Sequence, residues 1–290
     1  MYFNTIFNQL QSFFSRYEFQ KAVECYSGDK YVKKFTCWQQ FTTLLYAQTT
    51  QKNSLRDIIT ALNVHISKWY HLGLKSVTRS NLSYANNKRS CKIYEKTFNN
   101  FLEKCKNITP KHKFKFKNPL YSLDSTTIDL CLSVFSWAKF RKAKGGIKIH
   151  SLLDHQGHIP SFVVITNAKH QDIKIAKSLK LPLSSDSIIV FDKGYIDFKW
   201  LETLDKSKVF WVTRAKDNIK YQVVGQLKDN KNKKIISDQI ILSTGIITSK
   251  KYPKPFRMIK YYDTETDKLY TCLLYTSPSP RDRTRSRMPS

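Results

Sequence analysis

The chain has 290 residues, a length that can bury a sizeable hydrophobic core and that excludes disorder throughout. Its 50 lysines and arginines outnumber its 22 aspartates and glutamates, so the net charge is +28. Codon bias alone does not explain the deficit of acids, since AT-rich codons supply glutamate as readily as lysine. We therefore expect a polyanion, first of all nucleic acid, as the partner.

The N-terminal residues MYFNTIFNQLQSFF indicate neither a signal peptide nor a membrane span, because no basic segment precedes the apolar residues and Asn and Gln interrupt them. The six cysteines form no C-x-x-C pair and have no metal-ligand spacing. In a chain of this length they predict reduced, mostly buried thiols. We expect a protein of the cytoplasm with no membrane partner.

The first 110 residues predict a helical domain, because apolar residues recur there with helical period. Ser54 can cap a helix over SLRDIITAL, with Asp57 in its first turn, where the helix dipole favours an acid. Farther on, Arg79, Lys88 and Arg89 lie in a second helical segment and are candidate contacts to DNA phosphates. The alternative for these three residues is an ordinary solvated helix face.

Short β-type runs begin near residue 117. Three of them, LYSLDSTTIDL, GGIKIHSLLD and HIPSFVVIT, precede a short helix over QDIKIAKSLK, and a fourth run, SDSIIVF, follows it. This order predicts a mixed sheet in which the fourth strand can lie parallel beside the first. Asp124 in the first run and Asp192 after the fourth would then come together.

The segment from about 206 to 272 carries further β-type stretches with Lys-rich turns, which predict a small β-rich insertion rather than more of the parallel sheet. Residues 273–290 differ from the rest because Pro, Ser and Arg dominate and no period survives. This tail resembles the translated read-through of a sequencing adapter. We expect the tail to be disordered.

Asp124 and Asp192 are the candidate catalytic residues. A carboxylate within an apolar strand is costly without a cation or hydrogen-bond partners, and ligands gather at the carboxyl edges of strands in open sheets. Two carboxylates on adjacent strands suit Mg²⁺ or Mn²⁺, which can clamp oxygens in phosphoryl transfer. The alternative is that Asp124 caps a strand and Asp192 opens a turn. Zinc is disfavoured, because His150, His155 and His158 do not share one helical face.

Four successive motifs resemble those of the insertion sequence 4 family of DDE transposases in order and in spacing. They are LDSTTIDL, KGGIKIHSLLD, VFDKGYIDF and FWVTRAKDN. Upstream, SLRDIITAL and SVTRSNLSYANNKR resemble the helical region that accompanies this catalytic domain, so the resemblance covers roughly residues 5 to 272.

The resemblance implies an α/β fold, with a ribonuclease-H-like mixed sheet and a β-rich insertion, preceded by an α-helical domain. The implied ranges are 1–110 for a helical DNA-binding domain and 117–272 for the catalytic domain. Asp124 and Asp192 would be the first two catalytic acids and metal ligands. The implied activity is Mg²⁺-dependent nicking of double-stranded DNA at transposon ends, followed by attack of the freed 3′ hydroxyl on target DNA, by a homodimer.

Within the matching motifs, six residues are candidates for contacting phosphates or orienting DNA, with a plain surface role as the alternative: Lys148, His150, Lys193, Thr213, Arg214 and Lys216. Asp129, Asp154 and Asp197 also lie in these motifs but are expected to be structural, since strand alternation puts Asp129 on the face opposite Asp124.

The sequence departs from the family at the third acid, a glutamate within a Tyr, Arg, Glu, Lys signature beyond the insertion. After Asp192 the chain has only Glu202, which comes too soon, and Glu265, which lies in an expected hairpin turn. We therefore expect a truncated, inactive chain. The alternatives are a catalytically dead DNA-binding relic and a ribonuclease-H-like nuclease without strand transfer.

Overall fold

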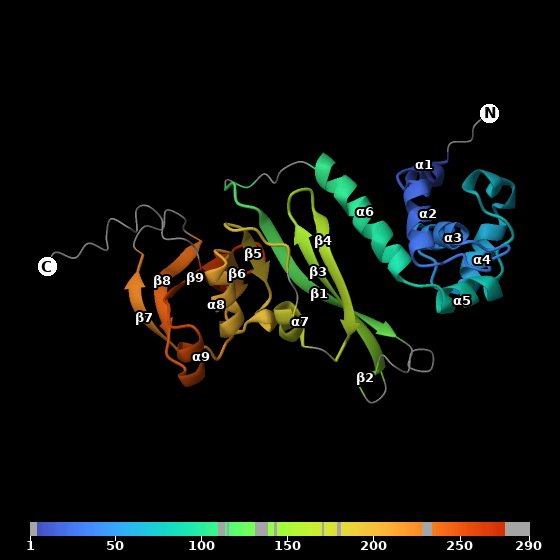
Figure 1. The fold of residues 1–290 in the computed structure, drawn as a ribbon. Helices are drawn as coiled ribbons and strands as arrows, with labels where there is room; N and C mark the ends of the chain where they lie inside the picture. The colour runs from blue at the N-terminus through green and yellow to red at the C-terminus, as the bar shows by residue number, and fades with distance from the viewer. Residues whose placement is uncertain are drawn as a thin grey trace. The chain divides into compact units, whose positions relative to one another are not determined.

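The computed structural model describes residues 5–109, 114, 116–130, 139–141, 144–169, 171–178, 181–227 and 234–275. The chain divides into two compact units, residues 1–108 and 109–290 (Figure 1). Within the described residues, no helix is long and apolar enough to cross a membrane.

Unit 1 is helical. Its elements are α1 (Ile6–Ser12), α2 (Arg16–Cys25), α3 (Cys37–Thr49), α4 (Leu55–Asn63), the 3₁₀ turns η1 (Ile66–Lys68) and η2 (Tyr70–Leu72), α5 (Arg79–Lys88) and α6 (Lys92–Ile108). Several helices begin at hydroxyl caps, as helix starts require. Ser54 Oγ accepts a hydrogen bond from the backbone N–H of Asp57 at 3.1 Å, which confirms the predicted start of α4.

The core of unit 1 forms around α3. Trp38 and Phe41 of α3 pack against Phe19 of α2 in one cluster, while Leu62 and Leu82 lie in a second cluster. Helix α5 ends at Lys88, because Arg89 has an extended backbone, and α6 begins at Lys92.

Unit 2 contains one sheet. Its strands are β1 (Leu120–Leu130), β2 (Lys139–Arg141), β3 (Lys144–Asp154), β4 (Ile159–Asn167), β5 (Ile188–Phe191), β6 (Phe210–Arg214), β7 (Tyr221–Gln226), β8 (Ile235–Ser243), β9 (Phe256–Asp263) and β10 (Lys268–Tyr275). The order runs β2-β3-β1-β5-β6-β10-β9-β8-β7, and β4 also pairs with β3.

The sequence predicted one strand direction in unit 2, a fourth strand parallel to the first, and the pairing of β5 with β1 confirms it. β3 is antiparallel to β1 and to β4, whereas β5 lies parallel to β1, as expected for a fourth strand that returns after a helix. β6 is parallel to β5, so the prediction that the segment from about 206 adds no further parallel strand is wrong for β6. The four later strands, β7 to β10, are all antiparallel to their neighbours and extend the same sheet from its β6 edge.

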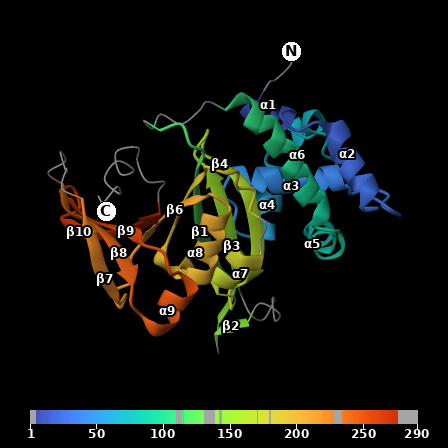
Figure 2. The same cartoon turned by 60° about the vertical axis from the view of Figure 1, so that its left-hand side comes forward.

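Helices cover one face of this sheet. α7 (Asp172–Ser178) and α8 (Phe198–Lys206) lie on the same side of it (Figure 2). Their residues Ala176 and Leu201 share a core cluster with Leu123 of β1 and Phe191 of β5. Because side chains alternate along a strand, the residues next to Leu123 and Phe191 point to the other face.

β10 extends three residues past the boundary that we predicted between domain and tail. Leu273 lies within β10, where it pairs with Thr213 of β6, and its side chain is fully buried. Burial of an apolar side chain on the helix-covered face holds these residues in the sheet. The remainder of the predicted tail, residues 276–290, lies outside the described residues.

Candidate active site

Asp124 and Asp192 occupy matching positions on neighbouring parallel strands. Leu123 of β1 pairs with Phe191 of β5, so the next residue along each strand, Asp124 and Asp192, comes at the same level. Leu123 and Phe191 are buried under the helices, whereas both aspartates are exposed on the opposite face. The register therefore places the two aspartates at adjacent backbone positions at the end of β5.

Arg214 occupies the same level on the next strand. Phe191 pairs with Thr213, so Arg214 follows on the face that carries Asp192. Its Nη2 atom lies 3.5 Å from Asp192 Oδ1, and the two side chains are 61% and 49% exposed. An ion pair at this distance between two solvent-exposed side chains contributes little to stability. The Arg214 guanidinium is therefore available to a ligand.

The same register explains why Thr213 and His150 are not exposed. Both belong to the helix-covered face, where Thr213 is 2% and His150 1% exposed. The His150 ring places Nε2 2.9 Å from Thr166 Oγ1 and Nδ1 3.3 Å from Tyr195 Oη. These two candidates for DNA contact therefore lie in the interior of unit 2, and the prediction that they contact phosphates is not favoured by their position.

Asp172, at the start of α7, is a residue that sequence reasoning missed. Its Oδ1 atom accepts hydrogen bonds from Ser125 Oγ at 3.0 Å and from Lys148 Nζ at 2.9 Å. Its Oδ2 atom faces Gly194, where an added Cβ would lie 3.7 Å away. Asp172 thus connects the residue after Asp124 to the turn after Asp192. The sequence predicted only the short helix on which Asp172 lies.

Tyr195 lies in the 3₁₀ turn η4 (Lys193–Tyr195) that follows Asp192. Burial raises the pKa of Tyr195 to about 12, and a hydrogen bond with Ser125 opposes this increase. The negative charges of Asp172, Asp124 and Asp192 raise it further. Tyr195 therefore stays protonated at neutral pH.

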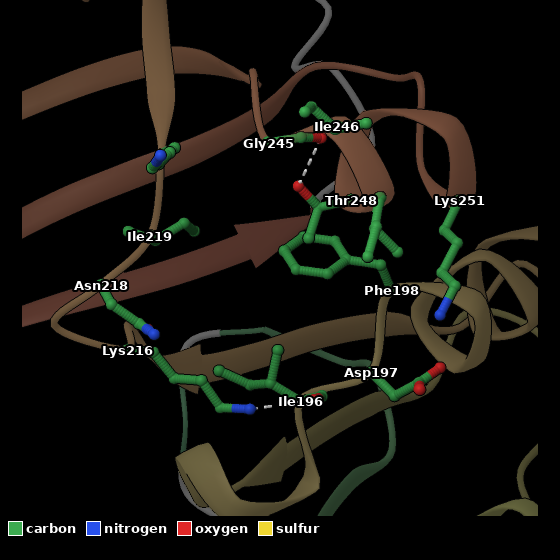
Figure 3. A pocket seen from close by; sticks show the side chains of 12 residues that line it. Ile196, Asp197, Phe198, Lys216, Asn218, Ile219, Gly245, Ile246, Thr248 and Lys251 are labelled. Carbon is green, nitrogen blue, oxygen red and sulfur yellow. Dashed lines mark hydrogen bonds between the residues drawn. The ribbon is translucent and has the colours of Figure 1, made fainter.

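The three candidate lysines differ in their surroundings. Lys148 is mostly buried and paired with Asp172, whereas Lys193 is half exposed and lies 3.6 Å from the exposed Asp217. Lys216 donates a hydrogen bond to the Ile196 carbonyl at 3.2 Å and lines a cavity of about 500 Å³ (Figure 3). Lys193 and Lys216 thus remain accessible near the carboxyl ends of β5 and β6, and Lys148 does not.

The cavity in Figure 3 lies between the start of α8, the loop after β6 and the short helix α9 (Ile246–Lys251). Its wall is mainly apolar, from residues such as Phe198 and Ile219, while Lys251 extends beside Asp197. Asp197 accepts a hydrogen bond from the backbone N–H of Trp200 at 3.1 Å and pairs with Lys177. It therefore caps α8, in keeping with the structural role expected for it.

In unit 1, the structure separates the three basic candidates. Arg79 and Lys88 are exposed on α5. Arg89 is mostly buried, and its guanidinium donates hydrogen bonds to Gln40 Oε1 at 3.0 Å and to the Phe35 carbonyl. Its position therefore favours a structural role over a DNA contact.

Among the described residues, no third acid joins the two aspartates. Within the parts of the chain that the structure describes, no group of three or more His, Cys, Asp or Glu residues is placed to hold a metal ion. Glu202 lies on α8 and pairs with Lys206, and Glu265 lies in the turn between β9 and β10. The expectation that Glu265 belongs to a hairpin turn is confirmed.

Comparisons with known proteins fall on both units. Residues 115–279, more than half of the chain, match a family model described as "Transposase DDE domain". Residues 3–75 match another, described as "Domain of unknown function (DUF4372)". The first match covers both aspartates, and it continues past residue 272, in keeping with the buried end of β10.

Two curated relatives resemble part of the chain. "Putative transposase y4zB" of Sinorhizobium fredii is 34% identical over 104 residues, which cover 36% of this chain and 28% of the relative. "Probable transposase for insertion sequence element IS5377" of Geobacillus stearothermophilus is 26% identical over 118 residues, which cover 41% and 30%. The matched part of the chain thus spans less than a third of each relative.

Proposed function

The chain belongs to the transposase DDE domain family, and on that premise we propose that unit 2 is a ribonuclease-H-like catalytic domain of the insertion sequence 4 type that uses Asp124 and Asp192 for phosphoryl transfer on DNA. The observation that carries this proposal is the register of β1 and β5, which sets the two carboxylates at one level on an exposed sheet face. The order β4-β3-β1-β5-β6 supports the fold, with three antiparallel strands followed by two parallel ones.

The donor set fits a magnesium or manganese ion. Both donors are carboxylates, and Mg²⁺ in phosphoryl-transfer sites takes one or two carboxylates together with waters and substrate phosphates. Asp124 and Asp192 would hold it. When bound, the ion supplies positive charge against the oxygens of the scissile phosphate. Arg214, at the same level as the two acids, would contact the neighbouring DNA backbone.

Double-stranded DNA, as transposon ends and target, is the proposed substrate, and a homodimer on DNA the proposed assembly. The net charge of +28 supports a polyanion as the partner. Lys193 and Lys216 provide exposed cations near Asp192, and Arg79 and Lys88 provide exposed cations on unit 1. We assign DNA binding to the helical unit 1 as part of the same proposal.

The proposal also holds that these 290 residues contain two of the three acids that the family uses. Glu202 and Glu265 are engaged on α8 and in a hairpin turn, away from the role of a third ligand. We therefore expect the chain to bind DNA with steep salt dependence and to cleave it poorly. A catalytically dead DNA-binding relic is the second candidate function, and the missing acid is the observation that favours it.

Binding of Mn²⁺ to this chain is the direct test, measured by calorimetry. We expect Asp124→Ala and Asp192→Ala each to weaken Mn²⁺ binding by on the order of tenfold or more. Loss of a residue that only supports a metal ligand already costs about tenfold or more in affinity, and loss of the ligand itself should cost at least as much. Asp129→Ala is the matched control, since Asp129 is exposed on the same strand but on the other face. Equal Mn²⁺ affinity in all four proteins would refute the assigned site.

Cleavage separates the transposase from the relic. A version of the protein extended to include the third acid is incubated with Mg²⁺ and transposon-end DNA, beside its Asp124→Ala and Asp192→Ala forms. Nicking that either substitution abolishes supports the transposase, and joining of the nicked ends to target DNA excludes a plain nuclease. Intact DNA binding without nicking would favour the relic.

A further inference from the structure

A hollow on unit 1 has a lining that is basic and aromatic and contains no acid. It measures about 590 Å³ and lies between the loop 26–36, which joins α2 to α3, and the helix α5. Its exposed cations are Lys30, Lys33 and Lys34 of the loop and Lys88 of α5. We call this hollow the basic groove.

The loop that carries the three lysines is fixed to the rest of unit 1. Asp29 Oδ1 accepts a hydrogen bond from the Cys37 backbone N–H at 2.7 Å, and the Arg89 guanidinium binds the Phe35 carbonyl. Gly28 packs so closely that an added Cβ would lie 2.5 Å from Ile93 Cδ1. The lysines are thus presented by a braced loop, which lowers the entropy lost when they bind a ligand.

Two tyrosines lie exposed in the lining of the groove. Tyr31 is 89% exposed and has a left-handed backbone, with φ of 61°, while Lys30 Nζ lies 5.2 Å from the centre of its ring. Tyr84 of α5 is 67% exposed and also lines a second hollow of about 870 Å³, which contains Arg56, Asp57 and Arg79. The two exposed rings are therefore available to a ligand, and Tyr84 borders both hollows.

We propose that the basic groove is a binding site for the backbone of double-stranded DNA, with Lys30, Lys33, Lys34 and Lys88 contacting phosphates and Tyr84 contacting the sugar-phosphate edge. The choice of DNA rests on the proposed function and on charge complementarity, because four exposed lysines in one hollow face no carboxylate in its lining. Cations lie on both sides of Tyr84, in the groove and, with Asp57, in the second hollow, which fits a long polyanion better than a small one.

The test compares two triple variants of the full chain with equal loss of charge. One replaces Lys30, Lys33 and Lys34 with Gln. The other replaces three exposed lysines of unit 1 outside the groove, Lys52, Lys68 and Lys75, with Gln. Binding to a fluorescein-labelled 30-base-pair duplex of arbitrary sequence is measured by anisotropy between 50 and 200 mM NaCl, and circular dichroism checks the fold.

If the groove binds DNA, the groove variant loses about one unit of slope in the plot of log K against log salt for each lysine, or about three in all. The control variant keeps nearly the full slope. In addition, Tyr84→Ala weakens binding with the slope unchanged, since it removes no charge.

The outcomes separate this inference from the proposed function. No DNA binding by the unaltered chain would overturn both. Steep DNA binding by the unaltered chain, with the same loss in the two triple variants, would leave the proposed function standing and overturn the groove. Stronger competition by an acidic polypeptide than by duplex DNA would also overturn the groove, and would assign it to a protein partner.

Discussion

Replacing Asp172 with alanine is expected to destabilise unit 2 by about 2–4 kcal/mol. The carboxylate accepts one hydrogen bond from Lys148 and one from Ser125, and bonds that involve a charged group contribute about 1.5–3 kcal/mol each. Because the Lys148 and Asp172 side chains are 17% and 22% exposed, solvent screens part of this, and we reduce the summed range of about 3–6 kcal/mol by about a third. The substitution also leaves the Lys148 ammonium mostly buried without its carboxylate.

The assay is a urea titration read by hydrogen exchange in peptides from β1 and β5, so that unfolding of unit 1 does not contribute. The stability of Asp172→Asn should lie between those of the unaltered chain and Asp172→Ala. Its amide oxygen can still accept a hydrogen bond from Ser125 but carries no charge to pair with Lys148. Asp129→Ala, an exposed acid on the same strand as Ser125, serves as the control and should change stability by about 0.5 kcal/mol or less. A loss for Asp172→Ala no larger than that of the control would refute the reasoning.

Three further predictions concern the packing of Leu273, the pH dependence of stability through Asp197, and the reactivity of the cysteines. Leu273→Ala should lower the free energy of unfolding in urea by about 2–5 kcal/mol, because the side chain is fully buried. A loss below about 1 kcal/mol would indicate that Leu273 belongs to the tail and not to the core. Burial raises the pKa of Asp197, but its hydrogen bonds to Lys177 and to the Trp200 N–H outweigh burial and hold that pKa below its usual value. Its contribution is therefore complete above the unfolded pKa and is lost as pH falls through the folded pKa. Asp197→Asn should thus destabilise the protein at pH 7, and the difference in stability from the unaltered chain should disappear once the pH is below the folded pKa. A difference that stays constant with pH would contradict this. Burial, first of all, raises the pKa of the Cys37 thiol to about 12. Iodoacetamide at pH 8 should therefore label the exposed Cys91 quickly and Cys37 only after unfolding. Mass spectrometry of the labelled peptides measures the two rates, and equal rates would contradict the prediction.

The sequence predicted the first part of the sheet well, because local patterns determine it. The run of apolar residues before Asp192 is short and follows a helix, which is the pattern of a parallel return strand, and β5 does pair with β1. The strands β7 and β9 were not predicted as separate elements. In β7 nearly every side chain is exposed, so no apolar alternation marks it, and only pairing with β8 defines it.

The candidate site was predictable where one residue carries its own signal, and not where partners distant in sequence decide. An acid at the end of an apolar strand marks Asp192 by itself. In contrast, Asp172, Lys148 and Ser125 meet only after the sheet and α7 have formed, and no spacing in the sequence joins them. For the same reason the sequence predicted Arg89 as a surface cation. Its partners Gln40 and Phe35 lie about 50 residues earlier, and no local pattern indicates that they bind it.

The pairing of β1 with β5 means that the candidate site depends on residue parity. Side chains alternate between the two faces of the sheet, so one residue inserted into or deleted from Ile188–Phe191 would send the Asp192 carboxylate toward α8 and bring an apolar side chain out in its place. A change of two residues would preserve the face and shift the level, separating Asp192 from Asp124 along the strand. Length variation among functional relatives should therefore be found in the loops before β5 and after η4, with the count of residues inside β5 held constant.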